Sequence, residues 1–324
     1  MEIYGNKEAV NRLTDYRANG RMPHSLLFFG DSGTGKRTLA FYTAMLYLCE
    51  KDDEAPCMKC LNCERTEKRI HPDVIYIDGE KTSVAQLREI LKDSHGASVE
   101  GGIRVYILSE FQILNRECQN ALLTYLEEPS DKVRYILTAS NKNGILPTIL
   151  SRTALIRTYP LSAEECEAAL KKAGASEEAE KFALTYKGNL GQALKALENK
   201  NTGLYFAAVK EYAEAVLKGD EYAALYTLSK LPQTKEDKRE PVRILITETA
   251  KLFHDALVAA EGGKASCGCD GGLSERLAKK YSLSLLNELC EITRRFSDIA
   301  ANVYFNTKSA SDAFTAGIFE KVKG

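Results

Sequence analysis

Short apolar runs separated by longer amphipathic stretches mark the first half of the chain. The runs have the length and the β-branched or aromatic content of buried strands, and they occupy residues 25–29, 74–77, 104–108 and 134–138. A helix is expected after the first run, through about residue 48, and a second one from Ser83, where Gln86 predicts a capping box. Strands that alternate with helices predict an α/β domain with a parallel sheet covered by helices on both faces.

The pattern changes near Pro160, where the strand-like runs end. The remainder reads as amphipathic helices rich in Ala, Leu, Glu and Lys, broken at 188–191 by a Gly-Asn-Leu-Gly segment. The glycine-rich segment 262–272 predicts a mobile loop between helices. We therefore expect an α/β domain, a small helical domain and a larger all-helical domain, over residues 1–160, 161–205 and 206–324.

The totals exclude some classes of protein. The chain has 324 residues and 44% hydrophobic composition, enough for more than one core. Lys and Arg number 44 against 45 Asp and Glu, so the net charge of -1 gives no sign of a strongly basic nucleic-acid binder. The sequence has neither an apolar leader nor an apolar run near the roughly 20 residues of a membrane span, so we expect a cytoplasmic protein without membrane contact.

A glycine-rich turn follows the first predicted strand and opens a predicted helix. Gly30, Gly35 and Lys36 match the phosphate-loop pattern G-x-x-x-x-G-K-[ST] in all but its last position. Gly33 is a further glycine within this loop. In this pattern, backbone N–H groups surround the phosphates, Lys reaches the terminal ones and the final hydroxyl holds Mg²⁺. Here Arg37 stands at the hydroxyl position, and Thr38 lies one residue further, about 100° around the helix. Magnesium therefore lacks one protein ligand.

The second motif of an ATPase site is an apolar strand that ends in an acidic pair, in which Asp holds the hydrated metal and Glu polarises the attacking water. The run at 105–108 ends in Ser109 and Glu110, so Ser replaces the metal-side Asp. Ser140, just after the run at 134–138, completes the predicted nucleotide site. Two contacts to the same ion are absent together, which indicates a site that no longer hydrolyses ATP. A tight turn unrelated to nucleotide is the alternative, and the flanking strand, the flanking helix and Lys36 argue against it.

Four of the nine cysteines cluster as C-x7-C-x2-C-x2-C, at Cys49, Cys57, Cys60 and Cys63. Four thiolates at this spacing can close a tetrahedral Zn²⁺ site, which leaves no open position and is therefore structural. Charged neighbours indicate an exposed excursion with no core in which unliganded thiols could be buried. Cys118, Cys166 and Cys290 stand singly and are interpreted as small hydrophobic residues, whereas Cys267 and Cys269 offer only two ligands in the glycine-rich loop.

Taken together, the motifs resemble those of a known family. The phosphate loop and the cysteine insert are followed by His71-Pro72-Asp73, Gln119-Asn120-Ala121-Leu122-Leu123, Leu126-Glu127-Glu128-Pro129 and Leu150-Ser151-Arg152. This series is similar to the bacterial clamp-loader AAA+ subunits of DNA polymerase III, gamma/tau and delta-prime. The likeness is dense over about the first 200 residues, and beyond them it rests on length and on Asn302 and Asn306. It is specific, because a four-cysteine insert within a P-loop domain is rare.

The resemblance implies roles that spacing alone does not. The family's Ser-Arg-Cys motif carries an arginine finger that reaches the ATP of a neighbouring subunit, and Arg152 matches it, with Thr153 in place of the Cys. Without the family, Arg152 would be interpreted as a surface arginine. Active ATPases of the family carry a sensor arginine in the lid motif G-S-x-R-D-A-L, where this chain has Gly191. Together with Arg37 and Ser109, this third loss places the chain with delta-prime and not with gamma/tau.

The resemblance also implies an AAA+ domain with a zinc insert at 49–63, a helical lid and a C-terminal collar within a hetero-pentamer of gamma/tau and delta subunits. Through that complex the chain would help place a sliding clamp on primed template DNA, supplying Arg152 in trans without ATPase activity of its own. Binding of ATP or ADP without hydrolysis stays open, because Lys36 and the loop amides remain. Two rivals are a gamma/tau-like active ATPase and a DNA-reading zinc ribbon, for which Lys59 and Arg65 give only a thin basic surface.

Overall fold

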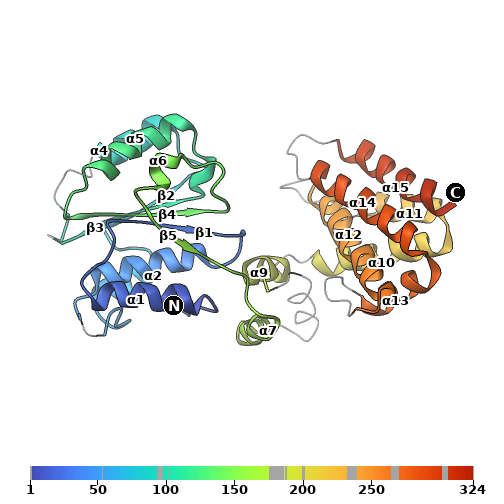
Figure 1. The fold of residues 1–324 in the computed structure, drawn as a ribbon, viewed down its shortest axis with the longest axis horizontal. Helices are drawn as coiled ribbons and strands as arrows, with labels where there is room; N and C mark the ends of the chain where they lie inside the picture. Colours follow the sequence, from blue (N-terminus) through green and yellow to red (C-terminus); the bar gives the residue numbers. More distant parts are fainter. Residues whose placement is uncertain are drawn as a thin grey trace. The chain divides into compact units, whose positions relative to one another are not determined.

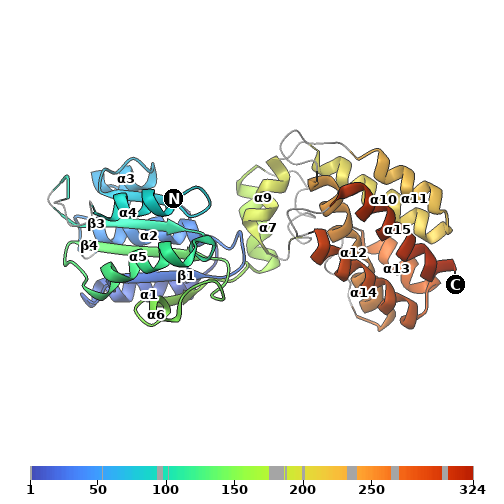
Figure 2. The same ribbon diagram turned by 90° about the horizontal axis from the view of Figure 1, so that it is seen from above.

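The chain forms two compact units, which Figures 1 and 2 show from two directions. One unit contains Met1–Ala169 and Gly188–Gln192, and the other contains Leu170–Lys187 and Ala193–Gly324. The division into three domains at residues 160 and 205 stays a prediction. Cys267, Cys269 and Asn302 lie outside the described residues. The computed structural model describes residues 2–52, 54–92, 98–100, 102–174, 186, 188–198, 201–231, 239–263, 270–300 and 306–323.

The first unit is built on a five-stranded sheet in the order β2-β3-β4-β1-β5. All strand pairs are parallel, and Leu27 lies opposite both Leu137 and Leu155. The four predicted strands are confirmed, as is the parallel α/β fold. The strands are β1 (Ser25–Phe29), β2 (Val74–Asp78), β3 (Arg104–Ser109), β4 (Val133–Ala139) and β5 (Ala154–Arg157).

Helices cover both faces of this sheet, as Figure 1 shows. On one face, α1 (Lys7–Ala18), α2 (Lys36–Leu48) and α3 (Leu61–Glu67) share a core with β1, β3 and β4. On the other face lie α4 (Val84–Lys92), the 3-10 turn η2 (Phe111–Ile113), α5 (Arg116–Glu127) and α6 (Pro147–Leu150). The capping box that opens α4 is confirmed, since the N–H of Ser83 donates to Gln86 Oε1 at 2.9 Å and the N–H of Gln86 donates to Ser83 Oγ at 3.3 Å.

Sequence analysis assigned no strand to β5 and no helix to α1. β5 has only four residues, of which Ile156 is buried and Arg157 exposed, and its three apolar residues are too short a run to predict a strand. The strand is defined by its pairing with β1, in which Leu26 lies opposite Ala154 and Phe29 opposite Arg157. A contact between segments more than 120 residues apart therefore decides this element, and local pattern does not reveal it.

The second unit is helical in every described element. Its core contains Tyr212, Phe253 and Phe314, and α12 packs against both α13 and α14. Asp270 caps α13 by accepting from the N–H of Leu273 at 3.1 Å, so Gly271 and Gly272 begin a helix; their assignment to a mobile loop was wrong. The helices that lie wholly in this unit are α10 (Thr202–Lys218), α11 (Glu221–Ser229), α12 (Glu240–Ala260), α13 (Gly271–Lys280), α14 (Leu283–Ala300) and α15 (Thr307–Lys323).

Two further helices, α7 (Ala163–Lys172) and α9 (Leu190–Glu198), are divided between the two units. In the chain they follow β5, which agrees with the predicted end of the strand-like runs near Pro160. Asn306 caps α15 by accepting from the N–H of Ser309 at 3.1 Å. No helix in the described ranges is both long and apolar enough to cross a membrane.

Candidate functional site

The predicted phosphate loop connects β1 to α2, and its lysine points back onto the loop itself. Lys36 is only 5% exposed, and its Nζ donates to the carbonyl oxygens of Gly30 at 2.6 Å and Asp31 at 2.7 Å. Burial lowers the pKa of Lys36, and the nearby Glu110 and Asp31 act in the opposite direction. Two of the three ammonium donors are thus satisfied by the loop. Lys36 is therefore bonded to its own loop in this conformation.

The segment 188–192 packs directly against the glycines of this loop. Asn189 donates to the carbonyl of Ser32, and the N–H of Gly191 donates to the carbonyl of Gly33 at 3.1 Å. A Cβ on Gly191 would lie 2.7 Å from the Cα of Gly33, closer than side-chain carbons pack. Only glycine therefore fits at 191 while the loop keeps this position, so an arginine there would require the loop to move.

The two positions that lack a metal ligand are joined by a third residue, Tyr76 of β2. The Arg37 guanidinium carbon lies 5.4 Å from the centroid of the Tyr76 ring, within the range of a cation–π contact. The Tyr76 hydroxyl donates to Ser109 Oγ at 2.8 Å, and Ser109 is only 1% exposed. Phe41 of α2 stacks on the same ring with centroids 5.9 Å apart. Arg37 and Ser109 therefore both contact Tyr76, which is 37% exposed.

The surviving acidic residue, Glu110, is held by neighbours from two strand ends. Its Oε2 accepts from Ser140 Oγ at 2.9 Å and from Gln112 Nε2 at 2.8 Å. Gln112 Oε1 in turn accepts from the N–H of Ser140 at 3.2 Å, which closes the cluster. Glu110 adopts a left-handed backbone conformation with φ of 47°, which is uncommon for a residue with a side chain and is frequent at functional sites. The predicted nucleotide-site positions thus come from the ends of β1, β3 and β4, from the first turn of α2, which holds Lys36, Arg37 and Thr38, and from α9, which holds Gly191.

Arg152 follows α6 and carries a half-exposed side chain. Its Nη2 lies 3.1 Å from Glu127 Oε1 of α5, and its Nη1 donates to the carbonyl of Thr148 at 3.0 Å. The backbone is fixed by Ser25 Oγ, which donates to the carbonyl of Arg152 at 2.6 Å. Thr153, where the family has Cys, is buried and donates to the carbonyl of Ile149 at 3.1 Å. The side chain is accessible to solvent and the main chain is held.

The four predicted metal ligands come together at the far end of α2. The Sγ atoms of Cys49, Cys57, Cys60 and Cys63 all lie within 4.8 Å of one another. The N–H groups of Cys57 and Cys60 point at the sulfurs of Cys49 and Cys57, at 3.4 and 3.3 Å. Backbone N–H groups of Lys59 and Cys60 lower the pKa of the Cys57 thiol to about 6, which favours the thiolate that binds metal. We name these four residues the cysteine knuckle.

The expectation that this insert has no core was wrong for half of its thiols. Cys49 is 5% and Cys63 1% exposed, and both belong to the core that α2 forms with the sheet. Cys49 directly follows α2 as its C-cap, and Cys63 lies on α3, which packs against α2. The three single cysteines behave as small hydrophobic residues, since Cys118 and Cys166 are buried and Cys290 packs against the helical core.

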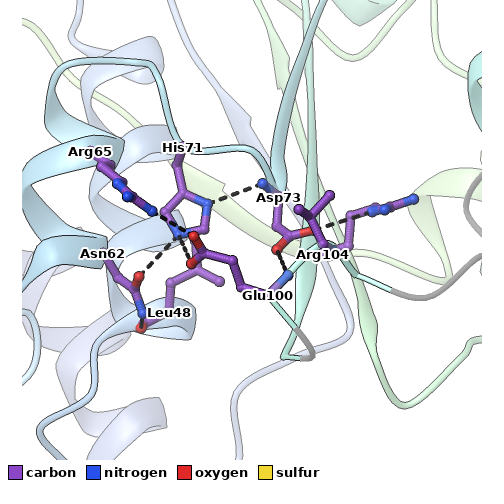
Figure 3. A network of polar contacts seen from close by, with 8 residues as sticks. Leu48, Asn62, Arg65, His71, Asp73, Glu100 and Arg104 are labelled. Carbon is purple, nitrogen blue, oxygen red and sulfur yellow. Dashed lines mark hydrogen bonds and ion pairs between the residues drawn. The ribbon is translucent and has the colours of Figure 1, made fainter.

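A polar network around His71 and Asp73, shown in Figure 3, joins the cysteine insert to the start of two strands. The N–H of Asp73 donates to Nδ1 of His71 at 3.1 Å, so the ring proton is on Nε2, which lies 3.2 Å from Asn62 Oδ1. Asn62 Nδ2 donates to the carbonyl of Leu48 at 3.0 Å, one residue before Cys49. Burial lowers the pKa of His71, against the opposing effect of Glu100, and so favours this neutral ring.

The other end of the network reaches β3. Asp73 accepts from the N–H groups of Val99 at 2.7 Å and Glu100 at 3.1 Å, and its Oδ1 lies 3.6 Å from Nε of Arg104. The Glu100 side chain pairs with Arg65 of α3. The His-Pro-Asp motif noted in the sequence therefore fixes the insert to the sheet.

Sequence reasoning missed Tyr76, Gln112, Asn62 and Asn189 as members of these clusters. Tyr76 sits in an apolar run as an ordinary strand residue, and its partner Ser109 is 33 residues away. Asn189 was noted only as part of a glycine break, although an Asn directly after a glycine is a signal of a side chain that bonds to backbone. Gln112 lies two residues after Glu110, but no motif assigns a role to its position.

A parallel sheet that carries a phosphate loop between an inner strand and a helix, with an acidic residue at the end of a nearby strand, defines a P-loop protein of the AAA+ class. The fold agrees with the crystal structure of a DNA polymerase III gamma-subunit-related protein from Thermotoga maritima, at a TM-score of 0.50 and 16% identity over 98% of this chain and 100% of that one. The family described as DNA polymerase III, delta subunit, matches residues 5–162.

Curated relatives define the family more closely. The chain is 30% identical over 255 residues to DNA polymerase III subunit gamma of Buchnera aphidicola subsp. Acyrthosiphon pisum, which covers 75% of this chain and 70% of that protein. It is 28% identical over 181 residues to subunit delta' of Bacillus subtilis, covering 55% of each chain. The chain belongs to the family of DNA polymerase III clamp-loader subunits. It spans 57% and 50% of two other Buchnera gamma subunits, and likeness alone does not separate the gamma and delta' branches.

Proposed function

We propose that the chain acts as the delta-prime subunit of the clamp loader: it does not hydrolyse ATP and supplies Arg152 to the ATP site of a neighbouring gamma/tau subunit. The AAA+ domain over 1–160, the lid over 161–205 and the collar over 206–324 are part of this proposal. Its partners would be gamma/tau and delta subunits, and it would act on the sliding clamp and primed DNA through their complex.

The contact between Arg37, Tyr76 and Ser109 carries this proposal. An ATPase of this class needs a hydroxyl and a carboxylate to hold Mg²⁺ and its water shell beside the phosphates. Here Arg37 and Ser109 stand at those two positions, and both contact Tyr76, Arg37 through the ring and Ser109 through the hydroxyl. A cation at the position of Arg37 also repels a divalent ion. We infer that loss of hydrolysis is built into the packing of this unit.

The sensor position supports the same inference independently. An arginine that senses the γ-phosphate must approach the loop, whereas Gly191 donates its N–H to Gly33 and leaves no room for a side chain. Lys36 is bonded to its own loop as well. Binding of ATP or ADP without hydrolysis would require Lys36 to exchange these carbonyls for phosphate oxygens.

Arg152 has the properties that an arginine finger requires. Its backbone is held by Ser25, its guanidinium is half-exposed, and it is not spent on a partner within the core. A guanidinium presented by one subunit stabilises the charge that develops on the phosphates of another during transfer. In this scheme ATP turnover in the neighbouring subunit depends on how this subunit positions Arg152.

The cysteine knuckle fits a structural Zn²⁺. Tetrahedral coordination with Zn–S bonds of about 2.3 Å separates the sulfurs by about 3.8 Å, close to the 4.8 Å within which the four Sγ atoms already lie. All four ligands come from this chain, which leaves no place for a substrate. When bound, the metal would neutralise the thiolates and fix the insert. We therefore propose a structural role for the ion, with Cys49, Cys57, Cys60 and Cys63 as ligands.

A gamma-like active ATPase is the second candidate, because the curated gamma subunits are among the most similar relatives. It predicts that the isolated chain hydrolyses ATP with Mg²⁺ and that Lys36→Ala abolishes this turnover. The proposal made here predicts no turnover above that of Lys36→Ala. Intrinsic turnover that depends on Lys36 would reject it.

The trans role is tested by reconstituting the complex with gamma/tau and delta, with Arg152→Ala in place of the parent chain. The variant should assemble and lose most of the clamp- and DNA-stimulated ATPase, since a finger contributes roughly 10³-fold or more at the site it serves. Arg157→Ala is the control, because Arg157 is an exposed arginine on β5 of the same unit. Unchanged turnover with Arg152→Ala would remove the finger.

A further inference from the structure

The guanidinium of Arg152 is oriented by three acceptors before any neighbour arrives. Nη1 donates to the carbonyl of Thr148 at 3.0 Å and to Ser151 Oγ at 3.4 Å, and Nη2 lies 3.1 Å from Glu127 Oε1. A guanidinium has five N–H donors. Nε–H and the second N–H of Nη2 therefore have no acceptor among the described residues, and they remain for an outside oxygen.

Unlike the other two acceptors, Glu127 lies on a different element from Arg152, the helix α5. Thr148 and Ser151 lie within four residues of Arg152 and move with its own turn. Glu127 is the last residue of α5, a helix anchored in the core by Leu122 and Leu126. It is thus the contact that fixes the direction of the side chain relative to the sheet.

We propose that Glu127 is a positioning residue for Arg152: its carboxylate holds the guanidinium in the direction from which the free N–H groups can meet the phosphates of the neighbour's nucleotide. This inference rests on the proposed function of Arg152. An unpaired arginine must lose the freedom of a long, flexible side chain when it engages, and a paired one has lost much of it already. The pair is half-exposed, so it adds little to folding stability and its removal leaves the fold intact.

The adjacent glutamate provides a matched control. Glu128 directly follows α5 as its C-cap, where its N–H donates to the carbonyl of Thr124, and no ion pair to its side chain is found in the described residues. Glu127→Ala and Glu128→Ala remove the same charge from the same turn, so their difference isolates the contact with Arg152. Glu127→Gln keeps an oxygen acceptor without the charge and should restore part of the effect.

The test is a double-mutant cycle in the reconstituted complex, in which ATPase stimulated by clamp and DNA is measured for Glu127→Ala, Arg152→Ala and both together. Glu127→Ala should lower kcat by roughly 3- to 10-fold, the size expected when a long side chain must be ordered anew, with the KM for ATP unchanged. The double variant should match Arg152→Ala, because Glu127 acts only through that side chain. Glu128→Ala should match the parent.

Each other result has a defined meaning. If Arg152→Ala lowers turnover and Glu127→Ala leaves it unchanged or raises it, positioning is wrong and the finger stands. A further loss from Glu127→Ala in the Arg152→Ala background would show that Glu127 acts elsewhere, and would also overturn positioning. If Arg152→Ala itself has no effect, the proposed function fails and this inference fails with it.

Discussion

The two ends of helix α2 carry two candidate sites that differ in the metal ligands they offer. At its N-terminus, the phosphate loop keeps its glycines and Lys36 but has lost both side chains that hold a metal. At its C-terminus, Cys49 begins a knuckle in which all four ligands remain and lie close together. One helix thus joins a phosphate loop without the motif's metal ligands to a cluster of four cysteines that fits a metal ion.

The difference lies in what each site needs to hold itself together. The phosphate loop is satisfied by protein groups alone, through the contacts of Lys36, Asn189 and Gly191. Metal binding at the cysteine knuckle requires four thiolates within 4.8 Å of one another, although burial raises the pKa of Cys49 and Cys63, so only a bound cation can hold all four sulfurs in the charged form. We infer that the first site keeps its shape without ligand and the second does not. Ligand dependence is therefore the property to test.

The largest effect is expected from Cys63→Ser, which removes a ligand that is 1% exposed. The chain should bind less than one zinc, and its free energy of unfolding should fall by on the order of 4 kcal/mol, because metal binding is folding energy in such sites. Metal content by mass spectrometry under native conditions and chemical unfolding give the two values. Cys118→Ser is the control: it also puts a hydroxyl at a buried position, but it should keep the metal. Full zinc content in Cys63→Ser would show that the comparison of the two ends is mistaken.

A smaller effect on the same site is expected from Asn62→Ala. Asn62 connects His71 to the carbonyl just before Cys49, and partners of this kind contribute about 10- to 100-fold to metal affinity. Competition with a chromophoric chelator measures the affinity directly. Glu64→Ala, an exposed change on the same helix α3, should leave it unaltered. Equal affinities for the two variants would restrict the network of Figure 3 to the fold of the sheet.

At the other end of α2, Asn189→Ala tests whether the phosphate loop is held by protein contacts. The change removes the hydrogen bonds to Ser32 and from the N–H of Gln192, and should lower the free energy of unfolding by about 1–2 kcal/mol. Amide exchange in residues 30–37 should rise while zinc content stays the same. Gln192→Ala removes an exposed neighbouring amide side chain and is the control. Unchanged exchange in the loop would mean that Lys36 and Gly191 suffice to hold it.

The sequence predicted those parts of the fold that repeat a local pattern. Four strands appear as apolar runs, and the cysteine knuckle appears as a spacing, because each is a short segment with its own signature. β5 was missed because four mixed residues become a strand only by pairing with β1. The same limit applies within the sites. Tyr76, Asn62 and Glu127 gain their roles from partners that the fold brings near, and no spacing in the sequence encodes those contacts.

The substitutions at the two metal-binding positions of the motif show the same difference between what a local pattern predicts and what only the fold creates. Arg37 and Ser109 were recognised as substitutions because a motif states what should stand there. That the two substitutions share one aromatic ring follows only from the register of β2 on β3, in which Asp78 lies opposite Ser109 and Tyr76 opposite Ile107. The fold therefore converts two separate losses into one cluster. Restoring a metal site would require replacing Arg37, Tyr76 and Ser109 together and not one at a time.

The smallest effect concerns His24, which directly precedes β1, the strand that leads into the phosphate loop. It tests whether acid sensitivity comes from this histidine or from the cysteine knuckle. Burial, with Arg134 nearby, lowers the pKa of His24 from its ordinary 6.5 to about 4, and its Nε2 has no hydrogen-bond partner among the described residues. Above pH 6.5 the ring is neutral in both folded and unfolded chains. As the pH falls from there towards 4, the unfolded chain takes up a proton that the folded chain refuses, so stability is progressively lost.

The change His24→Asn should therefore flatten the stability of the first unit between pH 6.5 and 5. We expect a difference on the order of 1 kcal/mol at pH 5.5, after allowance for the part of the ring that water reaches. Urea unfolding of both chains at each pH measures it, and the difference between them cancels the acid sensitivity of the thiols, which both share. A parallel pH dependence in the two chains would assign the acid loss to the cysteine knuckle. A difference in unfolding free energy that changes with pH would show that protonation of His24 destabilises the sheet that carries the phosphate loop, although the loop keeps its shape without a ligand.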